Sequence, residues 1–458
     1  MNKLRLPLTC FYMVFFTLYS LITRFTWTAA KIDGNINATL YRLLLIIGCL
    51  LAFWWLIACR GQLRTALSSP RKNPDIFLLA AFVLVLCIST LANYSYHLLD
   101  NVFGIVTFVF QLILFYLMGR TLAEGKWEDI LRKIILCGSV LWDIACAGSL
   151  AQFFLGISYR TTYASDRGAV RQGITDGRLF GLFSDPNFAA FTSLLLLLGL
   201  FHIIHKGKNS LPFRIFIDCS IALNAAYIIM SNSRTVYLSV VGTVLFYVLL
   251  TSYNKYRKTH KETDGVSIFK FLLIRTVITL AALLVTYFLI LISMRGIAEI
   301  ITPERDTAIE MVREDVNTEN ISNNRFTIWK AYLELYKEKP VFGFSTRGAL
   351  PYALANYPDS YLGKTQYMTH NSYLSLLIET GAVGFCVMAA FIVLLIVRSL
   401  KRIRKSEPVS DLYILFSSWL VSILIFCLCF HDIFFTLNLE TMIFLSSLGF
   451  LWQKHFCD

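Results

Sequence analysis

The sequence predicts an all-α polytopic membrane protein with about twelve transmembrane helices and one large, partly helical extracytoplasmic loop. Hydrophobic residues occupy 56% of the 458 positions and charged residues only 16%, and the mean hydropathy is +0.61. A soluble domain of this length could not bury so much apolar surface. Apolar runs long enough to cross a bilayer recur along the chain, and the links between them alternate between basic and non-basic.

Each predicted span is an apolar run of the length that a bilayer requires. The first run follows a short basic start that also occurs in signal peptides. This run is long and further spans follow it, so a retained first helix is favoured. Only a short polar break, His431–Asp432, separates the last two runs. The predicted spans are 7–23, 40–59, 75–93, 102–119, 134–156, 187–205, 213–230, 235–253, 269–293, 371–398, 411–430 and 433–452.

Lysine and arginine are concentrated in the links that follow the even-numbered spans. Because basic loops remain in the cytoplasm, this pattern places both chain termini inside. The predicted organisation is transmembrane helices one to nine in residues 1–294, a large extracytoplasmic loop in residues 295–370, and helices ten to twelve in residues 371–458. Cytoplasmic loops and lipid headgroup contacts then explain the net charge of +13. Nucleic-acid binding is not expected, because there is no basic soluble module to carry it.

Two links on the predicted outer side break this rule, because both are rich in arginine and poor in lysine. The planar guanidinium group can bind two phosphate oxygens at once, whereas lysine acts as a point charge. These arginines indicate an anionic, phosphate-bearing ligand, with headgroup contact or ordinary surface charge as the alternative. Arg234, in a very short outer turn between spans seven and eight, is a further arginine of this kind. The others are Arg160, Arg167, Arg171 and Arg178 in the first link, and Arg295, Arg305, Arg313, Arg325 and Arg347 in the second.

The large loop is predicted to be helical over residues 324–336, where apolar and aromatic residues recur on one helix face. Asn323 or Asn324 is the expected N-cap, and Pro340 lies just past the end. The helix is expected to lie along the membrane surface with its aromatic side chains at headgroup level. A second helix is predicted around three acidic residues, for which a solvated face is favoured over a metal site: Asp306, Glu310 and Glu314.

His370 is the first candidate for chemistry, since it lies where the large loop re-enters the membrane. It is predicted to occupy the first turn of span ten, with Thr369 as a cap. A helix N-terminus disfavours the imidazolium form, and a neutral histidine can act as a general base toward a sugar hydroxyl. The alternative is a histidine that only caps or packs. Asn371 follows it, and Glu379 lies more than about 10 Å further along a regular helix, where a carboxylate faces a polar cavity or ties to another helix.

The link before span six contains a second group of candidates. Ser184 or Asp185, followed by Pro186, is a good helix start on capping grounds alone. Capping explains Asp185 and Pro186 but not Arg178 or Asn187. Arg178 and Asn187 therefore remain candidates for substrate binding.

Three blocks of the sequence carry short motifs in a fixed order. They are Arg178-x-x-Gly-x-x-Ser-Asp-Pro-Asn187, then Ser231-x-Ser-Arg234, and then the motifs of the large loop, which run Asn324-Arg325-x-x-x-Trp329, Pro340-x-x-Gly343 and His370-Asn371-x-x-Leu374-x-x-x-x-Glu379-x-Gly381. With the twelve-helix layout, they resemble the bacterial O-antigen ligase and O-antigen polymerase superfamily over roughly the C-terminal two thirds of the chain. One departure is Ser345, which stands where the family often has a second glycine.

The resemblance implies glycosyl transfer outside a bacterial cytoplasmic (inner) membrane, without a metal, nucleotide sugar or other cofactor. The donor would be a saccharide on undecaprenyl pyrophosphate. The acceptor hydroxyl would belong to another lipid-linked saccharide, in a polymerase, or to a lipid core, in a ligase. A polymerase is favoured because no sequence feature marks a lipid-core acceptor.

Carried onto this chain, the resemblance implies that Arg234 and one or more of Arg178, Arg325 and Arg347 hold the pyrophosphate, while His370 activates the acceptor. Asn187, Asn371 and Glu379 complete the expected substrate-binding set. One alternative is a flippase or transporter of lipid-linked saccharide, although internal repeats and broken helices, which are typical of transporters, are not seen in the sequence. Another is a non-catalytic assembly or receptor subunit.

Overall fold

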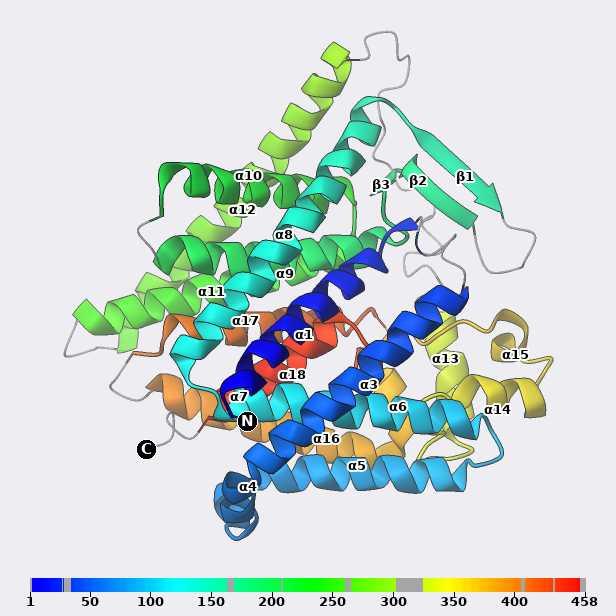
Figure 1. The fold of residues 1–458 in the computed structure, drawn as a ribbon. Coiled ribbons are helices and arrows are strands. Elements are labelled where there is room, and N and C mark those ends of the chain that lie inside the picture. The colour runs from blue at the N-terminus through cyan, green and yellow to red at the C-terminus, as the bar shows by residue number, and fades with distance from the viewer. Residues whose placement is uncertain are drawn as a thin grey trace.

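The structure is a computed structural model that describes residues 2–26, 28, 34–162, 169–206, 209–259, 265–301, 324–404, 408–430 and 433–453. Within these residues, ten helices are long and apolar enough to cross a membrane. The predicted all-α polytopic membrane fold is therefore confirmed. Two shorter apolar helices, α17 (Asp411–Phe426) and α18 (Leu439–Leu451), complete the bundle (Figure 1).

The long helices correspond to the first ten predicted spans. The fourth is interrupted by a π-helical turn, η2 (Leu112–Tyr116), which divides it into α6 and α7. A short helix, α4 (Arg60–Leu67), and a 3₁₀ turn, η1 (Pro70–Lys72), join α3 to α5. The bounds of the long helices are α1 (Asn2–Ile22), α3 (Gly34–Ala58), α5 (Pro74–Ala92), α6 (Leu98–Gln111), α7 (Leu117–Thr121), α8 (Glu124–Phe154), α9 (Pro186–Lys206), α10 (Leu211–Met230), α11 (Arg234–Thr259), α12 (Gly265–Ile301) and α16 (Ser372–Arg404).

The last two helices are shorter than the predicted spans 411–430 and 433–452. The segment that joins them is used for packing inside the protein. The main-chain oxygen of Cys427 accepts from the backbone N–H of Ser372 (2.9 Å), and that of Phe430 accepts from the Ser372 hydroxyl (2.6 Å). Every residue of α18 is buried. Because protein and not lipid surrounds α18, this helix does not need the full length of a lipid-exposed span.

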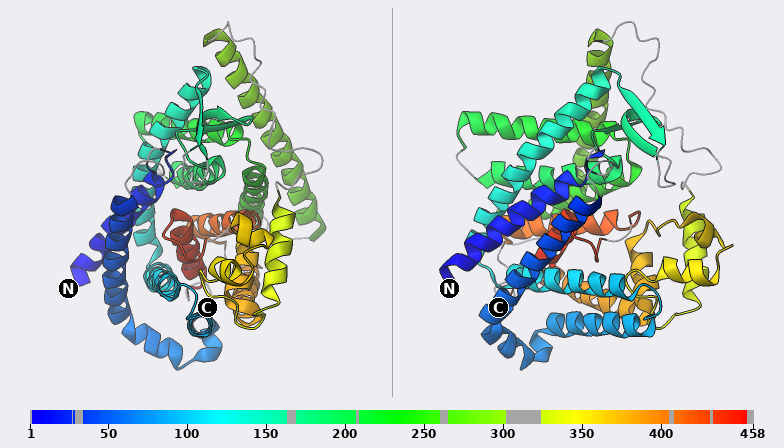
Figure 2. Two further views of the ribbon diagram at one scale, coloured as in Figure 1. Left: turned by 90° about the vertical axis from the view of Figure 1, so that its right-hand side faces the viewer. Right: turned by 45° about the vertical axis from the view of Figure 1, so that its right-hand side comes forward.

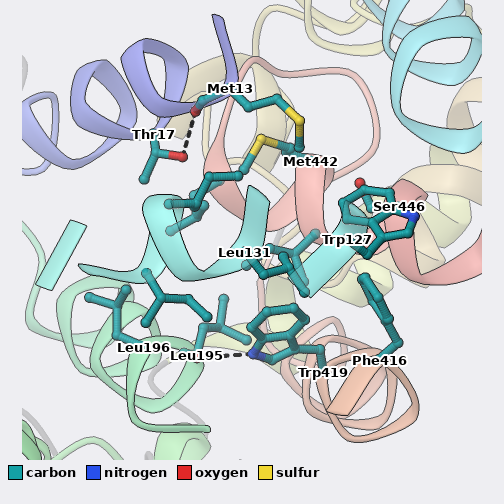
Figure 3. Close-up of a pocket in the computed structure, with 14 residues that line it drawn as sticks. Met13, Thr17, Trp127, Leu131, Leu195, Leu196, Phe416, Trp419, Met442 and Ser446 are labelled. Atoms are coloured by element: carbon teal, nitrogen blue, oxygen red, sulfur yellow. Dashed lines mark hydrogen bonds between the residues drawn. The ribbon is translucent and has the colours of Figure 1, made fainter. Parts of the chain in front are cut away.

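The centre of the bundle lies where α1, α8, α9, α17 and α18 meet (Figure 3). Two tryptophans, Trp127 of α8 and Trp419 of α17, border an apolar gap of about 20 Å³ there. The indole N–H of Trp419 donates to the main-chain oxygen of Leu195 (2.9 Å), so the polar atom of this buried ring is satisfied. A gap of this size has room for about one water molecule. It is a feature of core packing and not a substrate site.

The two ends of the bundle differ. In α16, Arg398 donates to the main-chain oxygens of Trp452 (3.5 Å) and Gln453 (3.3 Å), so the basic end of α16 lies beside the end of α18. At the opposite end, three strands and three short helices cover the bundle, as Figures 1 and 2 show. The strands, which the sequence did not predict, form an antiparallel sheet of β1 (Ser158–Thr162), β2 (Ala169–Thr175) and β3 (Arg178–Gly181), and the helices are α13 (Arg325–Tyr336), α14 (Ala349–Asn356) and α15 (Tyr361–Thr365).

The helix predicted over residues 324–336 is α13, and Asn324 occupies its N-cap position. Its aromatic side chains were expected at headgroup level, and this expectation is wrong for Tyr332. Ile328, Tyr332 and Leu335 are instead buried in a small core that α13 shares with α14, α15 and the start of α16. The predicted residues that lie outside the described part of the chain are Arg167, Arg305, Asp306, Glu310, Arg313, Glu314 and Asn323.

Candidate functional site

Arg178, at the start of β3, is the centre of a polar cluster that joins three distant segments. Only 7% of its surface is exposed. Its Nε donates to the main-chain oxygen of Ser231 (3.1 Å), and its Nη2 donates to Oδ1 of Asn187 (2.6 Å). The Ser233 hydroxyl donates to the same Oδ1 (2.8 Å). Arg178 and Asn187, both predicted site residues, thus hold together β3, the start of α9 and the turn before α11.

Asp185 caps the start of α9, as the capping preferences predict. Its Oδ1 accepts from the backbone N–H of Asn187 (2.7 Å) and from the side-chain nitrogen of the same residue (2.9 Å). Pro186 is the first residue of the helix, where its missing N–H has no cost. Asn187 therefore connects a carboxylate on one side with the Arg178 guanidinium on the other.

His370 lies just before α16 and is held by residues on both of its sides. Trp329 of α13 donates its indole N–H to the main-chain oxygen of Thr369 (2.9 Å), and Ser372 is bonded to the end of α17. The φ angle of His370 is 47°, in the left-handed region that costs a non-glycine residue about 1 kcal/mol or more. Surrounding contacts are needed to maintain such a conformation, and it is enriched at functional sites.

The prediction that His370 lies in the first helical turn, with Thr369 as its cap, is wrong. Helix α16 begins at Ser372, and Asn371 is its N-cap. The side-chain oxygen of Asn371 accepts from two backbone N–H groups of the first turn, at 3.0 Å each. An asparagine oxygen in this position satisfies amides that would otherwise lack partners. Asn371 therefore uses its oxygen to cap the helix.

The pKa of His370 is lowered, mainly by burial and next by the positive charge of Arg325, while the negative charge of Asp185 opposes this shift. Arg325 is the first residue of α13 and Asp185 caps α9, so His370 lies within electrostatic reach of both elements. The sequence suggested that a helix N-terminus would keep the ring neutral. In the structure, burial and the nearby guanidinium account for the shift, and the resulting neutral imidazole can accept a proton.

Arg347 and Glu379 lie apart from the Arg178 cluster, in a cavity of about 300 Å³ between α13, α14 and the first turns of α16. Tyr332 and Thr369 also line this cavity. Since Thr369 directly precedes His370, the cavity begins beside the histidine. Its volume is at the lower end of the range for small-ligand pockets. The expected polar surroundings of Glu379 are therefore present.

Helix α16 is broken at Gly381, where φ is 65° and ψ is −173°. The sequence-based expectation of unbroken helices is thus wrong for α16, and it no longer counts against a transporter. The segment 340–345 fills the break, so the freed backbone groups are satisfied inside the protein, as a membrane environment demands. The hydrogen bonds are Phe344 N to Ile378 O (2.9 Å), Ser345 N to Glu379 O (2.9 Å) and Ala382 N to Pro340 O (2.8 Å).

The remaining candidate arginines divide into those with and those without an ion-pair partner among the described residues. Arg160 and Arg171 both form ion pairs with Asp176 of the sheet, at 3.3 Å and 3.2 Å, which explains them without a ligand. Arg234 is exposed at the first position of α11 and makes no hydrogen bond or ion pair with another described residue. Arg325 is half-buried and likewise makes no hydrogen bond to a described residue. Neither of these two guanidinium groups is paired within the described part of the chain.

Two residues at this end of the bundle were not predicted, Arg24 and Glu440. Arg24 follows α1, and its Nη2 donates to Oε2 of Glu440 in the first turn of α18 (2.9 Å). The preference for basic residues inside the cell could have identified Arg24, because it follows an odd-numbered span. No local signal identifies Glu440, since only the fold brings the two residues together.

Comparison with known proteins finds a family model that matches part of the chain. Residues 219–389 match the family model described as O-antigen ligase. The matched range includes the turn at Arg234, helix α13, His370 and the break at Gly381. No curated protein matches the sequence. The many apolar helices and this match make the chain a multi-pass protein of the bacterial inner membrane that is similar to the O-antigen ligase and polymerase superfamily of membrane glycosyltransferases.

Proposed function

We propose that this protein transfers a saccharide from undecaprenyl pyrophosphate to an acceptor hydroxyl at the outer face of the membrane, and that it polymerises the repeat units of a surface polysaccharide. The observation that carries the proposal is the position of His370. Its pKa is lowered by burial and by Arg325, and Asp185 connects it electrostatically to the Asn187–Arg178 cluster. A proton acceptor thus lies within electrostatic reach of Arg325 and of the carboxylate that binds Asn187.

In the proposed reaction, the neutral ring of His370 accepts the proton of the acceptor hydroxyl. The acceptor oxygen attacks the anomeric carbon of the donor sugar, and the bond between that carbon and the pyrophosphate oxygen breaks. The electron pair leaves with the lipid pyrophosphate. The new glycosidic bond, the released carrier and the proton now on His370 account for all atoms of the donor and acceptor.

Arg234 and Arg325 are proposed to stabilise the charge that develops on the leaving pyrophosphate. Both have guanidinium groups without a hydrogen-bonding partner among the described residues. Donors already in place stabilise the transition state without reorganising. We propose that arginines, and not a metal ion, supply this stabilisation. Arg178 is buried and bonded to Ser231 and Asn187, so its part is to position the two segments from which the ligand groups project.

The cavity that holds Arg347 and Glu379 is proposed to receive a sugar of the acceptor. Glu379 can accept hydrogen bonds from sugar hydroxyls, and Arg347 can donate to them. Tyr332 provides an aromatic wall, and Thr369 links the cavity to His370. Under this proposal, Arg347 contacts the saccharide and not the pyrophosphate.

The basic end of the bundle is proposed to face the cytoplasm, with both chain termini on that side. The proposal rests on the concentration of lysine and arginine in the links at that end. The sheet, His370 and α13–α15 then lie outside, where the lipid-linked donor is displayed.

The test is to incubate the purified protein with lipid-linked repeat units extracted from its host. A ladder of products indicates a polymerase, whereas a single transfer to added lipid core indicates a ligase. Movement of the intact lipid-linked saccharide across vesicles without a new glycosidic bond would indicate a transporter and overturn the proposal. His370→Ala should reduce the rate by at least about 100-fold while the protein stays folded. An exposed residue of the sheet, Arg160→Gln, is the matched control and should leave the rate unchanged.

A further inference from the structure

We propose that Arg24, held in place by Glu440, is a further contact for the pyrophosphate of the donor. The inference rests on the proposed function and adds a residue from the first helix, outside the range that matches the family model. It would mean that α1 takes part in the site and does not serve only as scaffold.

The backbone at Arg24 is attached to the segment that leads into α9. The main-chain oxygen of Arg24 accepts from the backbone N–H of Ser184 (2.9 Å) and from its hydroxyl (3.0 Å). The next residue, Phe25, forms an antiparallel bridge with Phe183. Arg24 therefore approaches the start of α9 from α1, while Arg178 approaches it from β3.

The Arg24 side chain is oriented by two contacts. Its guanidinium carbon lies 4.2 Å from the centre of the Phe188 ring, and its Nη2 donates to Glu440. Glu440 is fully buried, and its second oxygen, Oε1, has no hydrogen-bond partner in the described part of the protein. A buried carboxylate with one unsatisfied oxygen is costly, so Arg24 is strongly held beside it.

The rest of the guanidinium group is available. Arg24 is 18% exposed, and its Nε and Nη1 make no hydrogen bond to any described residue. Only one of its nitrogens is used by Glu440. The remaining N–H groups can bind a phosphate oxygen with the strength of a charge-assisted hydrogen bond. An ion pair that only tied α1 to α18 would not require further donors without a partner among the described residues.

A short series of contacts connects this group to His370. The Phe188 ring, under the guanidinium, lies 4.7 Å from the Phe430 ring, measured between centroids. The main-chain oxygen of Phe430 accepts from Ser372, two residues after His370. Phe188 also directly follows Asn187, the partner of Arg178. Arg24 thus lies on the same side of the bundle as the proposed catalytic histidine and beside the same helix start.

The experiment measures the affinity of the full-length, detergent-purified protein for undecaprenyl pyrophosphate by native mass spectrometry, together with thermal stability. Arg24→Lys keeps a positive charge near Glu440 but loses the planar fork. We expect it to retain the melting temperature and to weaken binding roughly tenfold, as the loss of a charge-assisted hydrogen bond predicts. Arg160→Gln, which removes an exposed arginine of the sheet, should change neither quantity.

Unchanged lipid affinity in Arg24→Lys would overturn the inference and leave Arg24 as a structural tie. If this variant does not fold, the affinity of Glu440→Gln for undecaprenyl pyrophosphate tests the inference instead. The amide oxygen can still orient Arg24, but the neighbouring negative charge is gone, so binding should tighten; equal or weaker binding overturns the inference. Failure of the proposed function is recognised separately, because the unmodified protein would then neither bind undecaprenyl pyrophosphate nor form a glycosidic bond.

Discussion

Gly343 and Gly381 face each other across the break in α16, and each fits only because it lacks a side chain. A β-carbon on Gly343 would lie 2.4 Å from the main-chain oxygen of Ile378, and one on Gly381 would lie 2.2 Å from that of Val341. Both glycines also have positive φ angles, 68° and 65°. The two motifs that contain them, separated in the chain, are therefore two halves of one structural joint.

Replacing either glycine should damage this joint. Gly343→Ala and Gly381→Ala each combine a backbone clash with a strained φ angle, so we expect each to lower the free energy of unfolding by about 3 kcal/mol or more. The check is thermal unfolding of the purified protein followed by size-exclusion chromatography. Gly61→Ala in α4 is the matched control, because a β-carbon there meets no atom within 4 Å. Equal stability of all three variants would contradict this account of the joint.

Ser345 occupies the position where the family often has glycine, and its φ angle is indeed in the left-handed region, at 69°. Its hydroxyl is 2.6 Å from that of Thr90, and its backbone N–H is 2.8 Å from the Ser89 hydroxyl. Ser345→Ala keeps the strain and loses the Thr90 contact, so it should destabilise the protein by about 1 kcal/mol. Ser345→Gly loses the same contact but relieves the strain, so its stability should remain close to that of the unmodified protein. A higher melting temperature for Ser345→Ala than for Ser345→Gly would refute this explanation.

The rate should depend on pH through His370. Its pKa is lowered from the ordinary value of 6.5, so the ring is neutral at pH 7 and can accept a proton. Activity should therefore fall only as the pH drops below the lowered pKa of His370. Arg325→Gln removes a positive charge that lowers the pKa, so the acidic limb should move to higher pH. Asp185→Asn removes a negative charge that raises it, and the limb should move to lower pH, while asparagine still caps α9.

The pH–rate profiles of the three proteins test this assignment. The position of the limb is independent of the absolute rate, so a loss of substrate binding in Arg325→Gln would not disguise the result. Identical limbs in all three proteins would show that another group titrates.

The cavity beside His370 should affect binding of the acceptor and not binding of the lipid-linked donor. Glu379→Gln keeps the size of the side chain but replaces one acceptor oxygen by a donor. We expect the KM for the acceptor to rise roughly tenfold, with unchanged affinity for undecaprenyl pyrophosphate. Arg234→Gln should show the reverse pattern. Kinetics with separately varied donor and acceptor distinguish the two, and a loss of carrier affinity in Glu379→Gln would place the pyrophosphate in this cavity instead.

The first ten membrane spans, the helix at 325–336 and the start of α9 at Pro186 were all predictable. These features depend on hydrophobicity, capping and charge within a few residues of one another, which the linear sequence contains. The lowered pKa of His370 was also expected, although for a different cause.

Tertiary structure decided the features that depend on partners far away in the chain. The sheet before α9, the joint between Gly343 and Gly381, and the pairing of Arg24 with Glu440 have no local signal, because each needs two segments that only folding brings together. The division of the arginines has the same origin. Arg160 and Arg171 meet a carboxylate, while Arg234 meets none among the described residues. The difference is set by which surfaces pack against one another and not by the residue type.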